Sequence, residues 1–450
     1  MSSNSTIKPQ LRTFDLTVIV VGLIIGMGIF RTPAEVAGKA GIPMLFFLAW
    51  ITGAVVSLIG ALTFAEIGSR YPVAGGFYKI FSHCYHPCFA FMVNWITVIS
   101  NAASTAGVAI MGAEYIAPLL FPQLDPQEAI KILTITSVSV LFVVNFRGIR
   151  VSASLLNILM VVKIGMILLL ISSLFFLPSV SSATPIQSTS SNSFDVFKAF
   201  LICFIPVFFT YGGYQQTMNF GGDIRDAKRT MPKSIMVGIG IVLLLYLSVN
   251  YAYYHVLGFE GLKQSVKPAA AVAGLMLGSY ADTIVSFIMF FCVMAYVNVS
   301  MMSNPRIYYA MAEDKVMPAF FMRVNPRTQV QQWALTLFFV FILITLLTGA
   351  SFQKILDYVM FFDSISLISA AAAIFVLRFH AKKSGEQEGV FKMWGYPFLP
   401  ALFILIYLAV NISVLISNPT ASQIGLLLFA AGYPLYNLIR FGRRYRSKFF

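Results

Sequence analysis

Long apolar runs separated by short polar breaks follow one another from end to end of the chain. Most runs approach the ~20 residues that an α-helix needs to cross a bilayer core. The pattern predicts an all-α membrane protein with twelve transmembrane helices, near residues 14–39, 42–67, 88–118, 130–146, 151–177, 194–221, 234–257, 272–303, 333–350, 355–378, 396–416 and 421–439. No polar stretch is long enough for a separate soluble domain, so we expect one transmembrane domain over residues 1–450.

Composition supports this prediction, and the distribution of charge orients the helices. The chain is 58% hydrophobic and 11% charged, whereas soluble domains carry about 25% charged residues. The net charge of +14 would suit a nucleic-acid-binding protein, but most Lys and Arg residues fall in alternate polar breaks and in the C-terminal tail. This is the positive-inside pattern of a membrane protein. We therefore expect a multi-pass protein of the plasma (inner) membrane with cytoplasmic termini and no nucleic-acid partner.

The cysteines and histidines do not form a metal or catalytic motif. Cys84 and Cys88 lie in the run HCYHPC, which Pro87 interrupts and which lacks the paired spacing of zinc sites. Cys203 and Cys292 fall within predicted spans. The sequence contains neither H-E-x-x-H nor G-x-S-x-G. We expect no metal, no cofactor and no enzymatic activity; a membrane sensor or an intramembrane enzyme is the alternative from a different class.

Glycines interrupt two predicted spans at corresponding positions. The first span reads VVGLIIGMGIF, with Gly26 and Gly28, and the sixth reads FFTYGGY, with Gly212 and Gly213. Non-helical backbone persists at membrane depth only beside protein or a wet cavity. Paired interruptions therefore predict a transporter built from inverted repeats, with its site near the midplane. The alternative is that these glycines only allow helices to pack closely.

The interruptions would present backbone groups suited to an α-amino acid. A half-helix that begins near Gly28 offers N–H donors and a positive dipole end to a carboxylate. Unwound carbonyl oxygens nearby would accept from an ammonium group, namely those of Ile24, Ile25, Phe209 and Thr210. The side chain of the substrate would then enter a neighbouring pocket.

Three polar residues lie at membrane depth in other spans. Lys163 is the only basic residue in the fifth span and lies too deep to reach the cytoplasmic edge easily, so we expect it to be functional. For Asp363 and Asn298, a functional role and polar packing are both open.

Four segments match a known family pattern in the right order. IIGMGIF is similar to the signature G-x-G-I-F of span one, and AEIGSRYPVAGGFYKIFSHCYHP resembles the family's loop after span two. FFTYGGY resembles the family's sixth span, and PRIYYAMAEDKVMPAFFMRVNP resembles the stretch after span eight. Nearly the whole chain thus resembles the amino acid–polyamine–organocation superfamily, nearest its L-type amino-acid-transporter-like branch.

The resemblance implies a five-plus-five inverted-repeat fold of the leucine-transporter type. The repeats would cover residues 14–177 and 194–378, followed by two further helices at 396–439 and a cytoplasmic tail at 440–450. Phe209 matches the aromatic gate that closes over the substrate. Lys163 matches the fifth-span lysine that stands where sodium-coupled relatives bind sodium, and it would tie span one to span five.

The same resemblance assigns substrate-binding residues. They are Ile24, Ile25, Gly26, Met27, Gly28 and Ile29 in span one; Phe209, Thr210, Tyr211, Gly212 and Gly213 in span six; and Asn101, Thr105 and Asn298 in spans three and eight. Three positions depart from the family: Met27 replaces a small or hydroxyl residue, Tyr214 replaces Trp, and Gly222-Asp223 replaces an acidic pair.

The expected function is sodium-independent transport of amino acids across the plasma membrane, by exchange or proton-coupled symport. Because no acidic residue can be placed in the pocket of spans three, six and eight, a mainly neutral side-chain preference is expected. A polyamine or organic-cation permease is the nearest alternative, with Glu114 and Asp363 as its candidate acids. The sequence does not indicate an oligomeric state.

Overall fold

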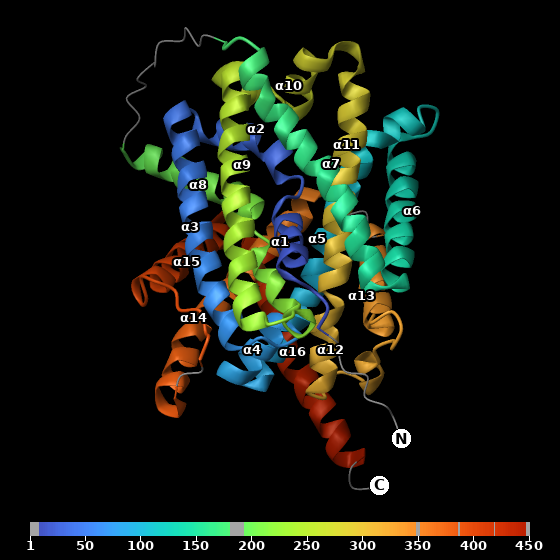
Figure 1. The fold of residues 1–450 in the computed structure, drawn as a ribbon, viewed down its shortest axis with the longest axis vertical. Coiled ribbons are helices and arrows are strands. Elements are labelled where there is room, and N and C mark those ends of the chain that lie inside the picture. Colours follow the sequence, from blue (N-terminus) through green and yellow to red (C-terminus); the bar gives the residue numbers. More distant parts are fainter. Residues whose placement is uncertain (1–8, 181–192, 348–351, 386–387, 418, 447–450) are drawn as a thin grey trace.

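A computed structural model of the chain describes residues 9–180, 193–347, 352–385, 388–417 and 419–446. The described residues fold as a bundle of helices (Figure 1). The α-helices are α1 Thr13–Ile24, α2 Gly28–Ala40, α3 Pro43–Arg70, α4 Gly76–Cys84, α5 Pro87–Leu120, α6 Pro126–Arg147, α7 Ile149–Phe176, α8 Ser193–Tyr211, α9 Ala227–Gln264, α10 Pro268–Leu277, α11 Ala281–Ser303, α12 Pro305–Glu313, α13 Gln332–Leu347, α14 Phe352–Ser384, α15 Phe398–Ser417 and α16 Pro419–Arg446.

The helices confirm an all-helical membrane protein and correct some predicted boundaries. Among the described residues, eight helical segments are long and apolar enough to cross a membrane, and four shorter apolar helices accompany them. The span predicted at 272–303 is two helices, α10 and α11, because Gly278 has a φ of +65° that ends α10. Within the span predicted at 194–221, the α-helix ends at Tyr211 and a 3₁₀ helix follows at Tyr214–Asn219. The short helices α4 and α12 were not predicted; both lie in loops between spans.

Four pairs of spans that are five apart in the order of the chain pack against each other. The paired helices are α2 with α8, α3 with α9, α5 with α11, and α6 with α13. These are spans one and six, two and seven, three and eight, and four and nine. Such pairing is what two related five-span halves produce when they interlock, and it agrees with the five-plus-five fold.

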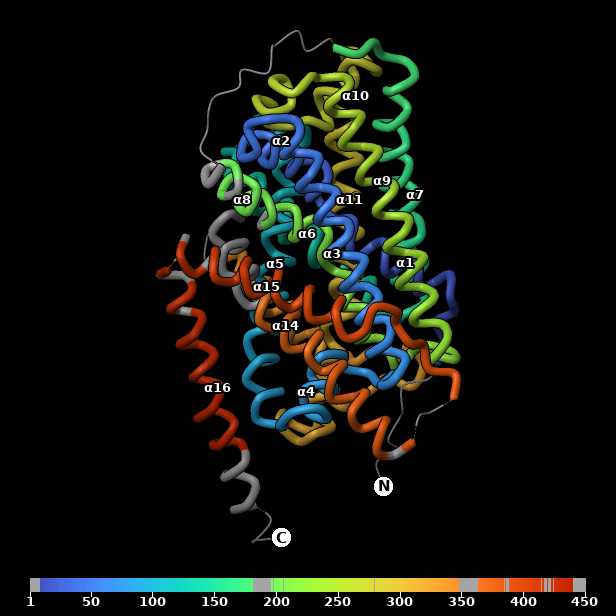
Figure 2. Tube along the Cα trace, turned by 90° about the vertical axis from the view of Figure 1, so that its left-hand side faces the viewer, coloured from blue at the N-terminus to red at the C-terminus, as the bar shows by residue number. Residues whose placement is uncertain are grey.

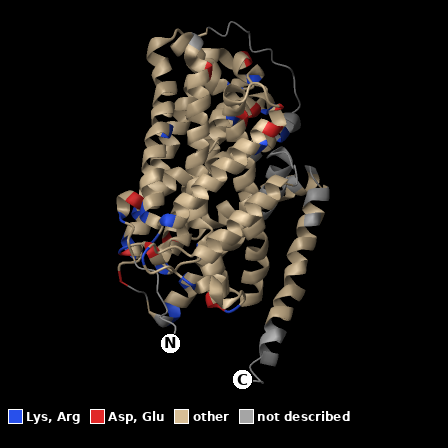
Figure 3. Ribbon diagram, turned by 90° about the vertical axis from the view of Figure 1, so that its right-hand side faces the viewer, with Lys and Arg blue, Asp and Glu red and all other residues tan. Residues whose placement is uncertain are grey.

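The two last helices and the charges complete the arrangement. Figure 2 shows α16 along one side of the bundle, with α15 crossing beside it. Charged residues gather toward the two ends of the molecule, and few lie between them (Figure 3). The described chain begins and ends at the same end of the bundle (Figure 1), as an even number of crossings requires.

Spans one and six are both interrupted, and the interruptions lie against each other. The helix α1 ends at Ile24, and α2 begins at Gly28. In span six, α8 ends at Tyr211, and Gly213 has a φ of +114° before a 3₁₀ helix at Tyr214–Asn219. A Cβ atom on Gly213 would overlap the carbonyl oxygen of Leu23. The backbones therefore meet at a distance that only glycine allows.

We expect Gly213→Ala to destabilise the protein by about 1–3 kcal/mol, because the added methyl group overpacks the crossing and strains a left-handed backbone. The measurement is thermal unfolding of the purified protein in detergent. Gly165→Ala in α7 is the control, because a Cβ there has open space. Equal melting temperatures for the two variants would show that the crossing tolerates a side chain.

Candidate functional site

A cavity of about 520 Å³ lies where the two interrupted spans cross. Its wall includes Gly26 and Gly28 from the first interruption and Gly212 and Gly213 from the second. It extends along α2 and reaches residues 263–266, between α9 and α10. Figure 1 shows α2 and α10 at the end of the bundle opposite the chain termini. The cavity thus joins the two interruptions to that end.

The first interruption points backbone donors at this cavity. Among the described contacts, no side chain caps α2 at Met27, so its first N–H groups and the positive end of its dipole are available to an anion. Met27 lines the cavity and is almost fully buried. The Met27 thioether therefore fills space that would belong to the cavity if a small side chain stood at this position.

Two side chains hold the unwound carbonyls of span one. The buried ammonium of Lys163 in α7 donates a hydrogen bond to the carbonyl oxygen of Ile25. The Tyr246 hydroxyl in α9 donates to the carbonyl oxygen of Ile24 at 3.1 Å. Lys163 therefore ties span one to span five, as the resemblance implied. These contacts also satisfy acceptors that an unwound segment would leave bare in the membrane.

The structure brings nine of the predicted substrate-binding residues together around the cavity and places five elsewhere. The nine that line it are Ile24, Gly26, Met27, Gly28, Asn101, Phe209, Thr210, Gly212 and Gly213. The five outside its lining are Ile25, Ile29, Thr105, Tyr211 and Asn298. For all fourteen, a role in substrate binding stays a prediction; the five outside the lining are engaged elsewhere in the structure.

The five residues outside the cavity lining make other contacts, and two of them form hydrogen bonds between or within helices. Thr105 donates to the Asn101 carbonyl oxygen at 2.7 Å and contacts the Ser300 hydroxyl at 2.8 Å. Asn298 donates to the Ser152 carbonyl oxygen and accepts from Asn145, so its amide joins helices by hydrogen bonds.

The remaining three are held within the packed protein. Tyr211 packs edge-on against Trp50 and beside Tyr246. The carbonyl oxygen of Ile25 accepts the hydrogen bond from Lys163, and both Ile25 and Ile29 are fully buried.

Several cavity residues were missed by the sequence reasoning. On α5 the lining residues Asn101, Ser104, Val108 and Met111 follow the three- and four-residue spacing of one helix face. That spacing is visible in the sequence and would have selected Ser104. On α11 the lining residue is Tyr296, about 200° around the helix from Asn298.

Acidic residues reach the cavity from spans outside the predicted pocket of spans three, six and eight. Asp363 in α14, which is span ten, lines the cavity together with Ser364 and Leu367, and Glu35 of α2 lines it too. The other proposed acid, Glu114, does not: it pairs with Arg31 at 3.7 Å, and both side chains are well exposed.

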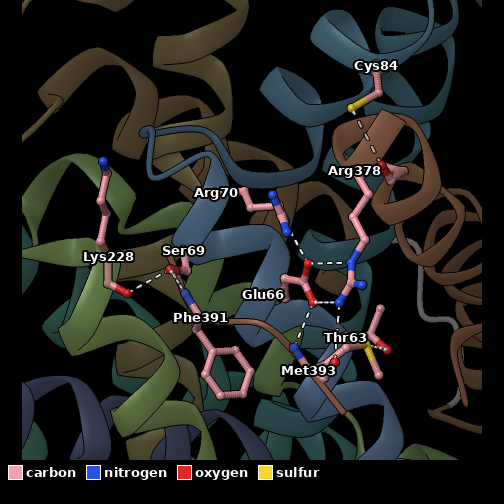
Figure 4. Close-up of polar contacts among 10 residues, drawn as sticks. Thr63, Glu66, Ser69, Arg70, Cys84, Lys228, Arg378, Phe391 and Met393 are labelled. Atoms are coloured by element: carbon pink, nitrogen blue, oxygen red, sulfur yellow. Dashed lines mark hydrogen bonds and ion pairs between the residues drawn. The ribbon is translucent and has the colours of Figure 1, made fainter. Parts of the chain in front are cut away.

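A buried carboxylate closes the end of the bundle near the termini. Glu66 at the end of α3 accepts hydrogen bonds from Arg70 at 2.6 Å, from Arg378 of α14 at 2.7 and 2.8 Å, and from the backbone N–H of Met393 at 2.8 Å (Figure 4). Ser69 adds a bond from the backbone N–H of Phe391 at 2.9 Å. This Glu66 network fastens α14 and the segment before α15 to α3.

Two further ion pairs lie at the same end. Asp223, just after span six, pairs with the buried Arg306 of α12 at 2.6 Å. At Gly222-Asp223, where the family has two acidic residues, this chain therefore retains one acidic residue, and that residue forms a buried ion pair. Lys79 of α4 pairs with Asp314 at 2.5 Å and Glu313 at 2.7 Å. Burial lowers the pKa of Lys79, but the hydrogen bonds and charges of these two acids outweigh burial and raise it overall.

The third departure, Tyr214, is accommodated by its neighbour. Tyr214 is almost fully buried at the start of the 3₁₀ helix of span six. Its hydroxyl lies so close to Gly60 of α3 that a Cβ atom on Gly60 would overlap it. A glycine in span two therefore provides the space for tyrosine at this position.

Two interrupted spans that cross at a cavity open toward one end, with ion pairs at the other end, define a multi-pass helical membrane transporter. The family model described as amino acid permease matches residues 11–432. The chain therefore belongs to the amino acid permease family of the amino acid–polyamine–organocation superfamily, in its L-type amino-acid-transporter-like branch.

Curated relatives cover nearly the whole chain. The serine/threonine exchanger SteT of Bacillus subtilis is 25% identical over 441 residues, which are 97% of this chain and 98% of that protein. The human cystine/glutamate transporter is 27% identical over 430 residues, covering 93% of this chain and 83% of that protein. The human large neutral amino acids transporter small subunit 2 is 24% identical over 448 residues, covering 96% and 80% respectively.

We expect Glu66→Gln to destabilise the protein by about 3 kcal/mol, because removing one partner of a buried ion pair leaves two guanidinium groups short of an anion. Thermal unfolding in detergent measures the change. Glu313→Gln is the control, because Glu313 is half exposed in its pair with Lys79 and such pairs contribute about 1 kcal/mol or less. A wild-type melting temperature for Glu66→Gln would contradict a structural role for this network.

Proposed function

We propose that this protein is a sodium-independent secondary transporter that exchanges amino acids across the plasma membrane by alternating access. The observation that carries the proposal is the cavity lined by both interrupted spans, where the uncapped start of α2 faces the unwound backbone of span six. The donors suit an α-carboxylate, and backbone carbonyls such as that of Thr210 suit an α-ammonium. Membership of the amino acid permease family supports this reading.

Exchange is favoured over proton-coupled symport as the form of transport. SteT is named as an exchanger, and the cystine/glutamate transporter is named for two amino acids. The substrate would cross unchanged, without enzymatic chemistry or a cofactor. The chain would form one transmembrane domain, with repeats at 14–177 and 194–378, further helices at 396–439, and a tail at 440–450 that is cytoplasmic like the N-terminus.

Sodium independence rests on the Lys163 contact. A sodium ion beside an interrupted helix would be coordinated by free carbonyl oxygens. Here the Lys163 ammonium already provides a fixed positive charge, which bonds to the carbonyl oxygen of Ile25. Lys163 is fully buried in α7, and removing it would leave that carbonyl unsatisfied at a cost of about 1–3 kcal/mol. Span one would then lose its attachment to span five.

We expect purified protein in sealed liposomes to take up amino acids equally well in sodium, potassium or choline buffer, and faster when the lumen is loaded with amino acid. Lys163→Ala should insert and fold but transport much more slowly. Control liposomes without protein set the background. Uptake that collapses without sodium would refute the sodium-independence proposal, and uptake that ignores luminal amino acid but follows an inward proton gradient would refute exchange.

We expect Phe209→Ala to slow turnover more than it weakens binding, because Phe209 lines the cavity two residues before α8 ends and its ring would cover the substrate. Closure of such a gate excludes water and commits the substrate. Binding is measured by competition and turnover by initial exchange rates.

The control for this gate needs a phenylalanine outside the cavity. Phe208 is unsuitable, because it also lines the cavity. It stacks on Phe204 and Tyr407 as well, with ring centroids 5.0 and 5.2 Å away. Phe287 on α11 is 37% exposed, and Phe287→Ala should exchange at the wild-type rate. If Phe209→Ala also does so, Phe209 is not a gate.

A further inference from the structure

One charge in the cavity wall differs from the others. The described charged residues of the lining are Arg31, Glu35, Lys263 and Asp363. The first three each belong to an ion pair: Arg31 with Glu114, Glu35 with Lys39 and Lys263 with Glu260. Across the described part of the chain, no cation or hydrogen-bond donor pairs with the Asp363 carboxylate. The buried Lys163 does not serve it either, because its ammonium bonds to Ile25.

Asp363 shares its cavity with the first interruption. Gly26, Gly28 and Asp363 all line it, together with Tyr296 of α11 and Tyr407 of α15. A Cβ atom on Gly26 would lie 3.9 Å from the Tyr296 ring. A ligand that leaves its backbone at the interruption would therefore have its side chain in the same cavity as the carboxylate.

A partly buried carboxylate without a partner is costly at this depth. Ionisable groups in membrane spans are retained where they face a cavity and meet a substrate, an ion or a proton. Two aromatic residues, Tyr296 and Tyr407, also line the cavity, and aromatic rings attract positive charge at their faces. The available space of about 520 Å³ falls within the range of pockets that hold whole small ligands, about 300–1,000 Å³.

We propose that the cavity selects amino acids with a positively charged side chain, and that Asp363 is the specificity-determining residue that pairs with that charge. The inference rests on the proposed amino-acid transport and names its substrate class. It replaces the neutral preference expected from the sequence, whose premise was a pocket without acid. Asp363 acts on the side-chain charge, while the interruptions recognise the α-carboxylate and α-ammonium groups.

Three ligands distinguish recognition of the side-chain charge by Asp363 from recognition of other groups, because norleucine and cadaverine each lack one group of lysine. Lysine carries all the groups, norleucine is a near match without the side-chain ammonium, and cadaverine is lysine without the carboxylate. Each is tested as a competitor of labelled-lysine exchange and as a transported substrate, with protein in sealed liposomes. The variants are wild type, Asp363→Asn, and Asp282→Asn as a matched control on an exposed acid at the start of α11.

We expect wild type and Asp282→Asn to prefer lysine to norleucine by at least about tenfold, since a charged hydrogen bond contributes about 1.5–3 kcal/mol. Asp363→Asn should lose that preference while its affinity for norleucine stays unchanged, which also shows that the variant is folded. Labelled norleucine replaces labelled lysine where lysine exchange becomes too slow. Asp363→Glu should restore part of the preference.

Each other outcome has a distinct meaning. Equal loss for lysine and norleucine in Asp363→Asn would place the α-ammonium at Asp363 and overturn the inference. A wild type without preference for lysine would overturn it too, and so would an Asp363→Asn variant that loses only pH dependence, which would assign the carboxylate to a proton. In all three cases, amino-acid transport would stand. Cadaverine transported as well as lysine would instead refute the proposed function and favour an organic-cation permease.

Discussion

An interrupted helix inside a bilayer is stable only if other groups satisfy the backbone that it releases, and the rest of this structure depends on that constraint. Lys163 and Tyr246 donate to the carbonyl oxygens of Ile25 and Ile24, so spans five and seven hold the interruption of span one. Gly213 lets span six approach Leu23 at the same level. The cavity, its uncapped helix start and its access from one end all follow from keeping these two interruptions together.

Much of this arrangement could be predicted because it depends on patterns along the chain. Runs of apolar residues marked most of the spans, and paired glycines marked both interruptions. Lys163 stood out because a lysine is rare at that depth. These features have strong local signals: hydropathy, backbone freedom and the cost of a buried charge. The four family segments then supplied the order in which the helices interlock.

The wall of the cavity was harder to predict, because it depends on how helices rotate about their axes. Asn298 and Thr105 are polar residues on the right spans, but their side chains bond to neighbouring helices. Tyr296 and Ser104 line the cavity instead. A polar residue at membrane depth has two uses, interhelical contact and ligand contact, and composition does not distinguish them. Asp363 was named as a candidate acid but not placed in the pocket, because the predicted pocket did not include span ten.

Charges are paired very differently at the two ends of the bundle, and this has an energetic consequence. Near the termini, Glu66 and Arg306 form ion pairs that are almost fully buried, whereas the pair of Arg31 and Glu114 at the other end is well exposed and longer. Opening the first end means returning several desolvated charges to water in one concerted step. This cost favours an empty carrier that faces the other way, and a bound substrate must offset the cost when the first end opens. Such a resting bias suppresses slippage, the return of an unloaded carrier that would uncouple one flux from the other.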